Sequence, residues 1–162
     1  MSRNNLMRGD LAYLRYEDAR ATDILQEYFV PVDRLPALVD LLRTVVEREP
    51  VNLLSATIRY LPADGESVLS YCPRGECFGL VLYVNVGRDA AAQREVARWT
   101  RELIDGALAL GGSYYLPYRP YATREQFRRA YPRAGELYDL KLRHDPGERF
   151  VSGFYFDYVR PG

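Results

Sequence analysis

Residues 51–61, VNLLSATIRYL, alternate between apolar and polar side chains with a period of two. Successive side chains of a strand point to opposite faces of its sheet, so this period predicts a strand with two unlike faces. One face is apolar and suited to packing against helices, whereas the other carries hydroxyls and a guanidinium. The apolar face comprises Leu54, Ala56 and Ile58, and the polar face comprises Ser55, Thr57 and Arg59.

A second stretch, FGLVLYVNV at 78–86, repeats this division. Its even positions are all apolar, and its odd positions are Gly79, Val81, Tyr83 and Asn85. Two strands with the same division predict a sheet that buries one face against helices and keeps the other open. The function of the protein therefore depends on what the open face binds.

Further elements are predicted on either side of these strands. Residues 24–30 are expected to form a strand that ends at Pro31, and 35–46 carry an apolar helical stripe with Asp33 as its cap. A short strand is expected at 67–72, and a second long helix from its cap at Asp89 to about Leu110. This order is close to the βαββαβ pattern of ferredoxin-like sheets, so we expect an α+β fold with an antiparallel sheet and both long helices on one face.

The ends of the chain are less regular. Residues 112–122 fit no period, but 123–126 match a capping box that opens a short helix. Another short helix is expected after Pro132, and 149–159 resemble a final aromatic strand. Residues 1–20 are polar and weakly patterned, which predicts an N-terminal tether to a single domain at 21–162.

Composition narrows the class of protein. The 162 residues include 22 basic and 22 acidic side chains, and a formal net charge of zero argues against a nucleic-acid surface. An RNA-binding sheet would also need an aromatic motif that these strands lack. No apolar run approaches the about 20 residues that cross a bilayer, and the N-terminus has no apolar signal region. We therefore expect a soluble, cytoplasmic protein.

Few side chains point to a chemistry by themselves. Cys72 and Cys77 flank a turn and are too few for a four-ligand zinc site, so reduced thiols are expected, with a disulfide or redox pair as the alternative. His144 is expected at the surface near a helix end. The sequence has no P-loop, no GxGxxG before a helix and no nucleophile elbow. Its 14 tyrosines suit a wet, apolar pocket or an interface.

Four stretches between residues 25 and 160 carry a family resemblance. They are LQEYFVPVDRLPALVDLL, TIRYLPADGESVLSY, GGSYYLPYRPYATREQFRRAYPRAGELYDLKLRHDP and RFVSGFYFDY, beginning at Leu25, Thr57, Gly111 and Arg149. In this order they resemble the C-terminal substrate, or cap, domain of FAD-linked oxidases of the vanillyl-alcohol oxidase type. The alditol, aldonolactone and decaprenylphosphoryl-ribose oxidases form the most similar branch.

The resemblance implies a function and a set of site residues. In this family the cap sheet lies over the flavin, and its open face lines the cavity in which an alcohol is oxidised by hydride transfer. The substrate-binding positions implied are Arg59, Thr57, Glu27, Val81 and Tyr83. The cofactor-binding positions implied are Tyr115, Tyr118 and Gly79. Neither a metal site nor a catalytic residue within the chain is implied.

The family's FAD is held mainly by a separate domain, whose glycine-rich pyrophosphate loop has no counterpart in this sequence. The implied partners are an FAD-binding domain of the same or another chain and a small hydroxylated substrate of the sugar, polyol or lactone type. The chain would be part of a longer enzyme or a protein that keeps only the cap, and inactive alone. Several members have a lysine at the position of Tyr118, and a phenol supplies a hydrogen bond but no positive charge.

An alternative reading needs no flavin. A stand-alone ferredoxin-like module would use the polar sheet face to bind a small ligand or a second copy of the chain, without catalysis. A homodimer is plausible because a tyrosine-rich face without its partner is an exposed patch.

Overall fold

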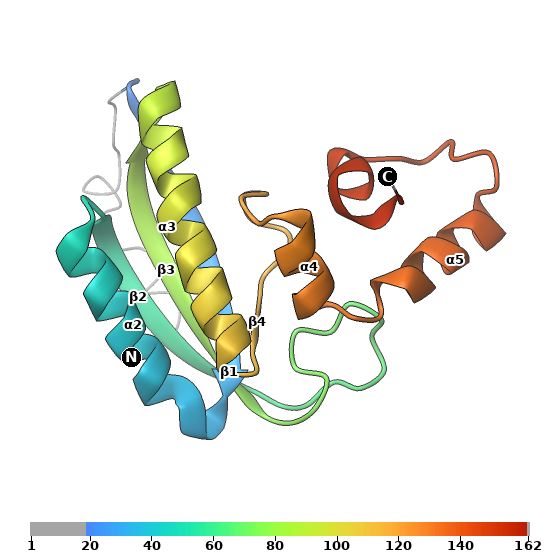
Figure 1. Ribbon diagram of the computed structural model, residues 1–162, viewed down its shortest axis with the longest axis horizontal. Coiled ribbons are helices and arrows are strands. Elements are labelled where there is room, and N and C mark those ends of the chain that lie inside the picture. The colour runs from blue at the N-terminus through green and yellow to red at the C-terminus, as the bar shows by residue number, and fades with distance from the viewer. Residues whose placement is uncertain (1–18, 162) are drawn as a thin grey trace, which may run out of the picture.

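Four strands form one antiparallel sheet in the order β2-β3-β1-β4. The computed structural model describes residues 19–161, so the predicted tether at 1–20 lies outside the described residues except for its last two positions. The strands are β1 (Ala21–Pro31), β2 (Asn52–Leu61), β3 (Cys77–Gly87) and β4 (Ser113–Tyr114). Two long helices, α2 (Leu35–Arg48) and α3 (Ala90–Ala109), lie against one face of the sheet (Figure 1). The predicted α+β, ferredoxin-like arrangement is confirmed.

The core lies between this face and the two helices. Alternate residues of β1 and β3 point into it, as the period of two predicts, and Tyr28 of β1 pairs with Leu80 of β3. The predicted helical stripes supply the other side of the core. The fully enclosed helix residues include Leu38, Leu42 and Val45 of α2 and Val96, Trp99, Leu103 and Ala107 of α3.

Both ends of α3 follow the sequence signals. The Asp89 carboxylate accepts hydrogen bonds from the backbone N–H groups of Ala91 and Ala92, at 2.9 and 3.0 Å. At the other end Gly111 has a φ of +81°, a conformation that side chains other than glycine rarely adopt. The chain then turns into the two-residue strand β4, which pairs with β1. The N-terminus of α2 differs from expectation, because a 3₁₀ turn (Val32–Arg34) comes first and Arg34, not Asp33, is its cap.

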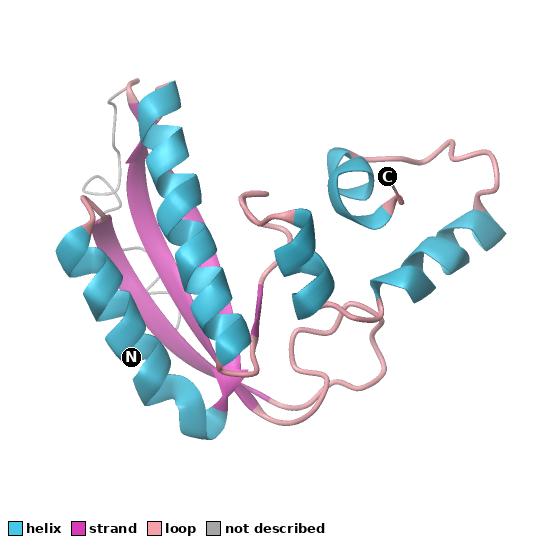
Figure 2. Cartoon of the chain, viewed as in Figure 1, coloured by secondary structure: helices cyan, strands magenta, loops and turns pink. Residues whose placement is uncertain are grey.

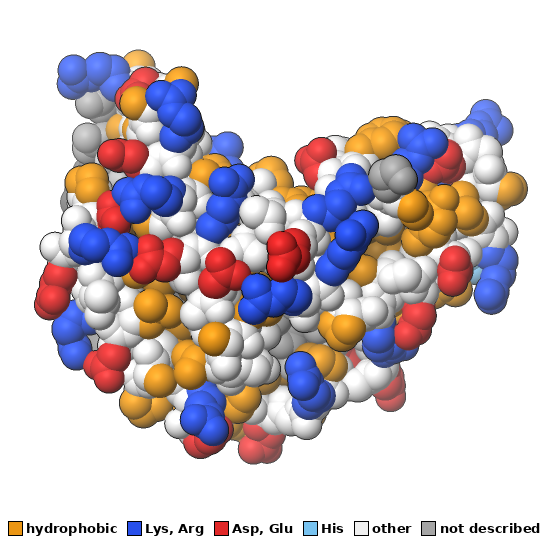
Figure 3. Space-filling model, viewed as in Figure 1, with side chains coloured by type: hydrophobic (Ala, Val, Ile, Leu, Met, Phe, Trp, Pro, Cys, Tyr) orange, Lys and Arg blue, Asp and Glu red, His pale blue; other side chains and the backbone are white. Residues whose placement is uncertain are grey.

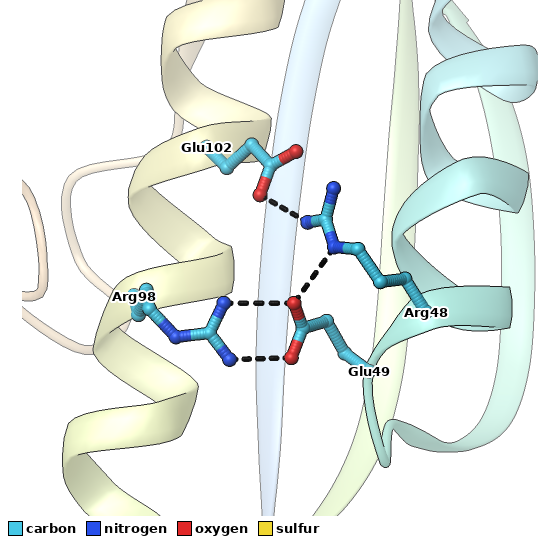
Figure 4. A network of polar contacts seen from close by, with 4 residues as sticks. All are labelled: Arg48, Glu49, Arg98 and Glu102. Atoms are coloured by element: carbon cyan, nitrogen blue, oxygen red, sulfur yellow. Dashed lines mark hydrogen bonds and ion pairs between the residues drawn. The ribbon is translucent and has the colours of Figure 1, made fainter.

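A network of charged side chains joins α2 to α3 (Figure 4). Glu49, just after α2, accepts hydrogen bonds from both terminal nitrogens of Arg98 on α3, one of them at 2.7 Å. Arg48 donates to Glu49 at 2.9 Å and also to Glu102 of α3. These two arginines hold the pKa of Glu49 down at about 2, with Arg98 the larger cause. The network joins the C-terminal end of α2 to the middle of α3.

The helix-side residues of β2 are less buried than the sequence predicts. Ala56 and Ile58 pair with Leu82 and Leu80, which places them on the helix side of the sheet. Ile58 nevertheless stays 50% exposed, because β2 is the last strand of the sheet and the helices lie mainly over the central strands. Leu54 is 48% exposed at a bulge between Leu53 and Ser55. The expectation that this face of β2 packs against helices was wrong.

The connection between β2 and β3 contains no strand, so the prediction of one at 67–72 was wrong (Figure 2). In this connection, side-chain oxygens accept hydrogen bonds from backbone N–H groups that a strand would use for pairing. The Asp64 carboxylate accepts hydrogen bonds from the N–H groups of Glu66 and Ser67, at 3.0 and 3.1 Å. The Ser70 hydroxyl accepts one from the N–H of Cys72 at 3.1 Å. Local bonds of this kind compete with strand pairing.

The C-terminal part forms two short helices and a turn, and the first of these helices packs against α3. Helix α4 (Arg124–Ala130) has the predicted capping box, and α5 (Ala134–His144) ends with His144 exposed in its last turn. The predicted final strand at 149–159 was wrong, because Tyr155–Val159 form a π-helical turn. Its neighbouring carbonyls accept hydrogen bonds from Arg124 at 2.7–3.0 Å, and Tyr158 packs on Phe127. Among residues 19–161, no helix combines the length and the apolarity needed to cross a bilayer.

Candidate functional site

Five of the predicted site residues lie together on the open face of the sheet. The strand register sets Arg59 of β2 opposite Gly79 of β3, and Thr57 opposite Val81. On the other side of β3, Val81 pairs with Glu27 of β1. Paired residues share a face, so the parity of three strands brings these side chains to one region.

An ion pair between Glu27 and Arg59 lies at the centre of this region. Arg59 donates from Nε to Glu27 Oε1 at 2.6 Å and from its NH2 nitrogen to Oε2 at 2.7 Å. The Glu27 side chain is fully buried, whereas that of Arg59 is 49% exposed. A guanidinium has five N–H donors, and these two bonds do not engage the NH1 nitrogen. The pair therefore presents a fixed hydrogen-bond donor at the surface with no net charge.

Gly79 makes room for this ion pair. A Cβ at position 79 would lie 2.8 Å from Glu27 Oε1 and 3.1 Å from Cε1 of Phe29. Side chains essentially never approach this closely, so only glycine lets the Glu27 carboxylate cross the central strand. Gly79 is itself buried beneath these groups. A ligand on this face would therefore meet the ion pair rather than Gly79, so the arrangement does not support the implied cofactor contact of Gly79.

Burial and charge set the protonation of the ion pair. Burial raises the pKa of Glu27 above its ordinary value, and the hydrogen bonds and charge of Arg59 oppose this shift. Because Arg59 encloses the carboxylate, Glu27 is suited to holding the guanidinium in place and is poorly placed to touch a ligand. This differs from the implied role of Glu27 as a direct substrate contact.

Tyrosine rings border the ion pair on one side. The rings of Phe29 and Tyr71 stack with centroids 4.3 Å apart, and Tyr115 meets Tyr71 edge-on at 6.1 Å. Tyr118 meets Tyr115 edge-on at 4.9 Å. The backbone N–H of Tyr115 donates to the carbonyl of Glu27 at 3.0 Å, which ties this loop to β1. The structure thus brings Tyr115 and Tyr118 to the predicted site and adds Tyr71.

The hydroxyl of Tyr118 is suited to donating a hydrogen bond. Burial raises the pKa of Tyr118, and the negative charge of Glu27 adds to the shift. The phenol is therefore protonated over the whole physiological pH range. It can orient a hydroxylated ligand but cannot supply the positive charge of a lysine.

A pocket of about 420 Å³ adjoins this region along β1. Its volume is in the range of small-molecule sites. Its side-chain lining is Asp23, Leu25, Tyr83, Pro117, Tyr118 and Arg119. Tyr118 borders both the ion pair and the pocket, and Thr57 and Val81 occupy the strand row between Arg59 and Tyr83. Arg59, Thr57, Val81, Tyr83 and Tyr118 thus lie along one stretch of the open face, with Glu27 and Gly79 buried beneath it.

A second polar cluster forms part of the pocket wall. The Asp23 carboxylate accepts hydrogen bonds from the Tyr83 hydroxyl at 2.6 Å and from Nδ2 of Asn85 at 2.7 Å. The bond from Asn85, and then that from Tyr83, lowers the pKa of Asp23. The sequence reasoning missed Asp23 and Tyr71. Asp23 has the same strand parity as Glu27, which was a usable signal, whereas nothing local marks Tyr71.

The starts of the two long helices do not offer a phosphate-binding site for a dinucleotide. Such a site uses free N–H groups at the start of a helix. In α3 the first of these groups are taken by the Asp89 carboxylate, and the first turn of α2 contains Pro36. These residues therefore do not fit the pyrophosphate of FAD, although the tyrosine-bordered open face can accept a planar ring or a hydroxylated molecule. Residues 19–161 also hold no cluster of three or more metal-binding side chains.

Two other features lie close to the site. Cys72 and Cys77 are buried, free thiols that pack with Phe29, and burial raises the pKa of Cys72. A neutral, enclosed thiol is a poor nucleophile. An apolar pocket of about 400 Å³ is lined by the loop that carries Tyr118 and by Phe154 of the C-terminal segment.

No protein-family model matches this chain, and no curated protein sequence matches it. The family resemblance of the four stretches therefore stays a prediction.

Proposed function

We propose that this chain is the substrate-binding cap of an FAD-dependent oxidoreductase that oxidises an alcohol. The flavin would be held by another domain of the same or another chain. The observation that carries the proposal is the half-buried Glu27–Arg59 pair on the open sheet face, with its carboxylate enclosed and with Tyr71, Tyr115 and Tyr118 at its border. Enclosing a carboxylate costs free energy unless it is fully paired, so a pair built at the centre of a polar face suggests a binding function.

The charges of the site favour a neutral, hydroxylated substrate. Glu27 cancels the charge of Arg59, so the pair offers hydrogen-bond donors without attracting an anion. The Tyr118 hydroxyl adds a donor, and the ionised Asp23 adds acceptor oxygens at the pocket wall. Matched donors and acceptors beside aromatic rings suit a sugar or polyol better than a carboxylic acid.

In this proposal the residues of the chain contribute placement. When bound, a flavin supplies the acceptor for the hydride that leaves the alcohol carbon. Arg59 binds and orients the substrate hydroxyl through its NH1 group, and Glu27 holds Arg59 in position. Tyr118 donates a second hydrogen bond, and the three tyrosine rings limit the access of water. Glu27 is enclosed and Tyr118 stays protonated, so neither acts as the base.

Exposed apolar side chains support contact with a further domain. Phe150 is 82% exposed, and Val151 and Phe156 of the same C-terminal segment are also exposed. Hydrophobic side chains gather over this part of the surface (Figure 3). Clustered apolar side chains at a surface are typical of interaction sites.

A ligand titration tests the substrate class. We expect xylitol to shift the NMR signals of the Tyr118 and Tyr83 rings in a saturable way, and xylonate to bind more weakly. Arg59→Lys should weaken xylitol binding several-fold, because an ammonium cannot keep the two-pronged contact with Glu27 and donate as well. Arg43→Lys on the exposed side of α2 is the matched control. Tighter binding of xylonate, or equal binding by both arginine variants, contradicts the proposal.

A flavin test addresses the cap assignment. The purified chain is mixed with FAD and desalted, and its visible absorbance is measured. We expect no flavin at stoichiometric level, because the starts of α2 and α3 do not fit a pyrophosphate. Stoichiometric retention would overturn the assignment of flavin binding to another domain.

A stand-alone binding module without catalysis is the second candidate. The observation in its favour is that the sheet and both helices of a ferredoxin-like unit are complete within residues 19–161. Affinity purification from native cells separates the two candidates. A co-purifying, flavin-containing partner or a longer flavin-containing chain supports the cap. A flavin-free protein that still binds xylitol supports the module.

A further inference from the structure

Strand β2 forms one long edge of the sheet that residues 19–161 build. Within residues 19–161, β2 pairs with β3 on one side and with no strand on the other. The strand has ten residues, from Asn52 to Leu61. Within the described residues, the N–H and C=O groups along its outer side therefore lack a strand partner and can pair with another strand.

Apart from one bulge near its start, this edge lacks the usual features that prevent pairing. Edge strands are commonly protected by proline, lysine or inward-pointing charges. The sequence NLLSATIRYL contains none of these except Arg59, and Glu27 neutralises that charge within the chain. The only irregularity is the bulge at Leu53–Ser55, near the start of the strand. From Ser55 to Leu61 the edge is regular and uncharged overall.

Exposed apolar side chains accompany the open edge. Ile58 and Tyr60 lie on the helix side and are 50% and 53% exposed. Leu54, at the bulge, is exposed to a similar fraction of 48%. Alternating side chains of this size on a solvated edge strand are unusual unless another strand covers them. A partner strand would cover them and satisfy the backbone groups at the same time.

We infer that β2 pairs antiparallel with β2 of a second copy of this chain, which joins two sheets into one of eight strands. The two-fold axis passes through Thr57, because this register pairs the regular residues Ser55 to Arg59 of the two copies with one another. It places Ile58 opposite Ala56, so that a large side chain meets a smaller one. Arg59 faces Ser55, so the two guanidiniums do not meet.

The same geometry is consistent with both functional proposals and depends on neither. The axis is perpendicular to the sheet, so the helices of both copies lie on one side and both open faces on the other. The area is small for a permanent dimer, because an edge strand contributes fewer residues than a standard interface. We therefore expect a dissociation constant on the order of micromolar.

Sedimentation velocity of the full chain from about 1 to about 200 μM tests this range of affinity. The expected result is a species with the mass of two chains that dissociates on dilution. Ile58→Lys should weaken the association at least tenfold, because a charge on the helix side of β2 would enter the interface. Phe150→Lys introduces the same charge at another exposed apolar position and should leave the dimer unchanged. Circular dichroism checks that both variants are folded.

A cross-linking experiment tests the register. Thr57→Cys faces its own counterpart across the axis, at a Cα separation that a disulfide can span. Oxidised glutathione should convert the two thiols into an intermolecular disulfide, releasing two molecules of reduced glutathione. Ser55→Cys lies on the same side of the sheet but faces Arg59, so it should cross-link much less. A monomer at all concentrations, a dimer insensitive to Ile58→Lys, or equal cross-linking by Ser55→Cys would overturn the inference.

Discussion

Glu27 and Arg59, separated by 32 positions in the sequence, form a two-pronged ion pair across Gly79 of the central strand. The pair requires three strands at one register, because Glu27 is on β1, Gly79 on β3 and Arg59 on β2. One oxygen of the carboxylate lies where a side chain at position 79 would have to be. This relationship links the stability of the sheet to the proposed binding surface.

Gly79→Ala should disturb both the stability of the sheet and the proposed binding surface. The added methyl group would press on Glu27 Oε1 and on the ring of Phe29, which are 2.8 and 3.1 Å from the ideal Cβ position. We expect a loss of about 1–3 kcal/mol in the free energy of unfolding, the usual cost of overpacking. Urea unfolding measures this cost. Gly75→Ala is the matched control, because no atom lies within 4 Å of its ideal Cβ. Equal effects of the two variants would contradict this account of Gly79.

Arg59→Met should make stability strongly dependent on pH. Burial already raises the pKa of Glu27, and losing the guanidinium would raise it further. The native state would then hold a proton that the unfolded chain releases above its ordinary pKa of 4.5, so stability falls as the pH rises through and above this value. We expect a loss of about 1–3 kcal/mol at neutral pH, discounted for the exposure of Arg59, and recovery as the pH falls to the ordinary value of 4.5 and below.

Two comparisons isolate this effect. Glu27→Met combined with Arg59→Met removes both charges, and it should recover much of the stability at neutral pH because no unpaired carboxylate remains. Arg43→Met breaks an exposed pair with Asp40 and should change little at any pH. Urea unfolding at acidic and neutral pH measures all three variants. If Arg59→Met alone loses the same free energy of unfolding at both pH values, Glu27 is not left buried and unpaired in that variant.

Acidification should weaken the link between α2 and α3. Arg98 and Arg48 hold the pKa of Glu49 at about 2, below its ordinary value of 4.5. A carboxyl group with a lowered pKa contributes stability above the ordinary value and loses it as the pH falls toward the lower one. The difference in melting temperature between the wild type and Glu49→Gln should therefore be largest above pH 4.5 and approach zero near pH 2.

Salt provides an independent check of the Glu49 network. Its charges are close to solvent, so raising the ionic strength should reduce the same difference in melting temperature. Glu47→Gln, on the exposed side of α2, is the control and should alter the melting temperature little. A difference for Glu49→Gln that stays constant from pH 6 down to about pH 2 would show that these ion pairs do not stabilise the fold.

Arg124→Met should release the C-terminal turn. The guanidinium donates hydrogen bonds to the carbonyls of Phe156, Asp157 and Arg160, and methionine keeps the aliphatic stem without these donors. We expect a loss of about 1–2 kcal/mol in the stability of this segment. Hydrogen exchange of the amides at 155–160 should become faster while that of β1 and β3 stays unchanged. Arg128→Met, exposed on the same helix, should leave the exchange rates as they are.

Much of the fold could be predicted because burial imposes a period on the sequence. The period of two in β3 and the helical stripes of α2 and α3 lead to one core, and local caps such as Asp89 mark the helix ends. The same parity explains why Glu27, Arg59 and Gly79 were expected on one face, since residues on paired strands share their faces. The strand periods, helical stripes and caps each depend on residues that are close in the sequence, so they can be predicted from one sequence alone.

Other features depend on contacts between distant segments. The period of two in β2 is the same for an edge strand as for a central one, so the exposure of Ile58 could not be predicted. The aromatic run at 149–159 suits a strand or a turn equally, and Arg124 from another helix selects the turn. Likewise, only the path of the connection after β2 brings Tyr71 onto Phe29.

The candidate site shows where this boundary lies. Local pattern determined which side of each strand is polar, because alternation is a property of the strand itself. Tertiary structure alone decided that Glu27 is enclosed by Arg59 while Arg59 stays half exposed. The exposure and the pairing of a side chain depend on which other strands and loops lie over it. The neighbours of that residue in the sequence do not specify those contacts.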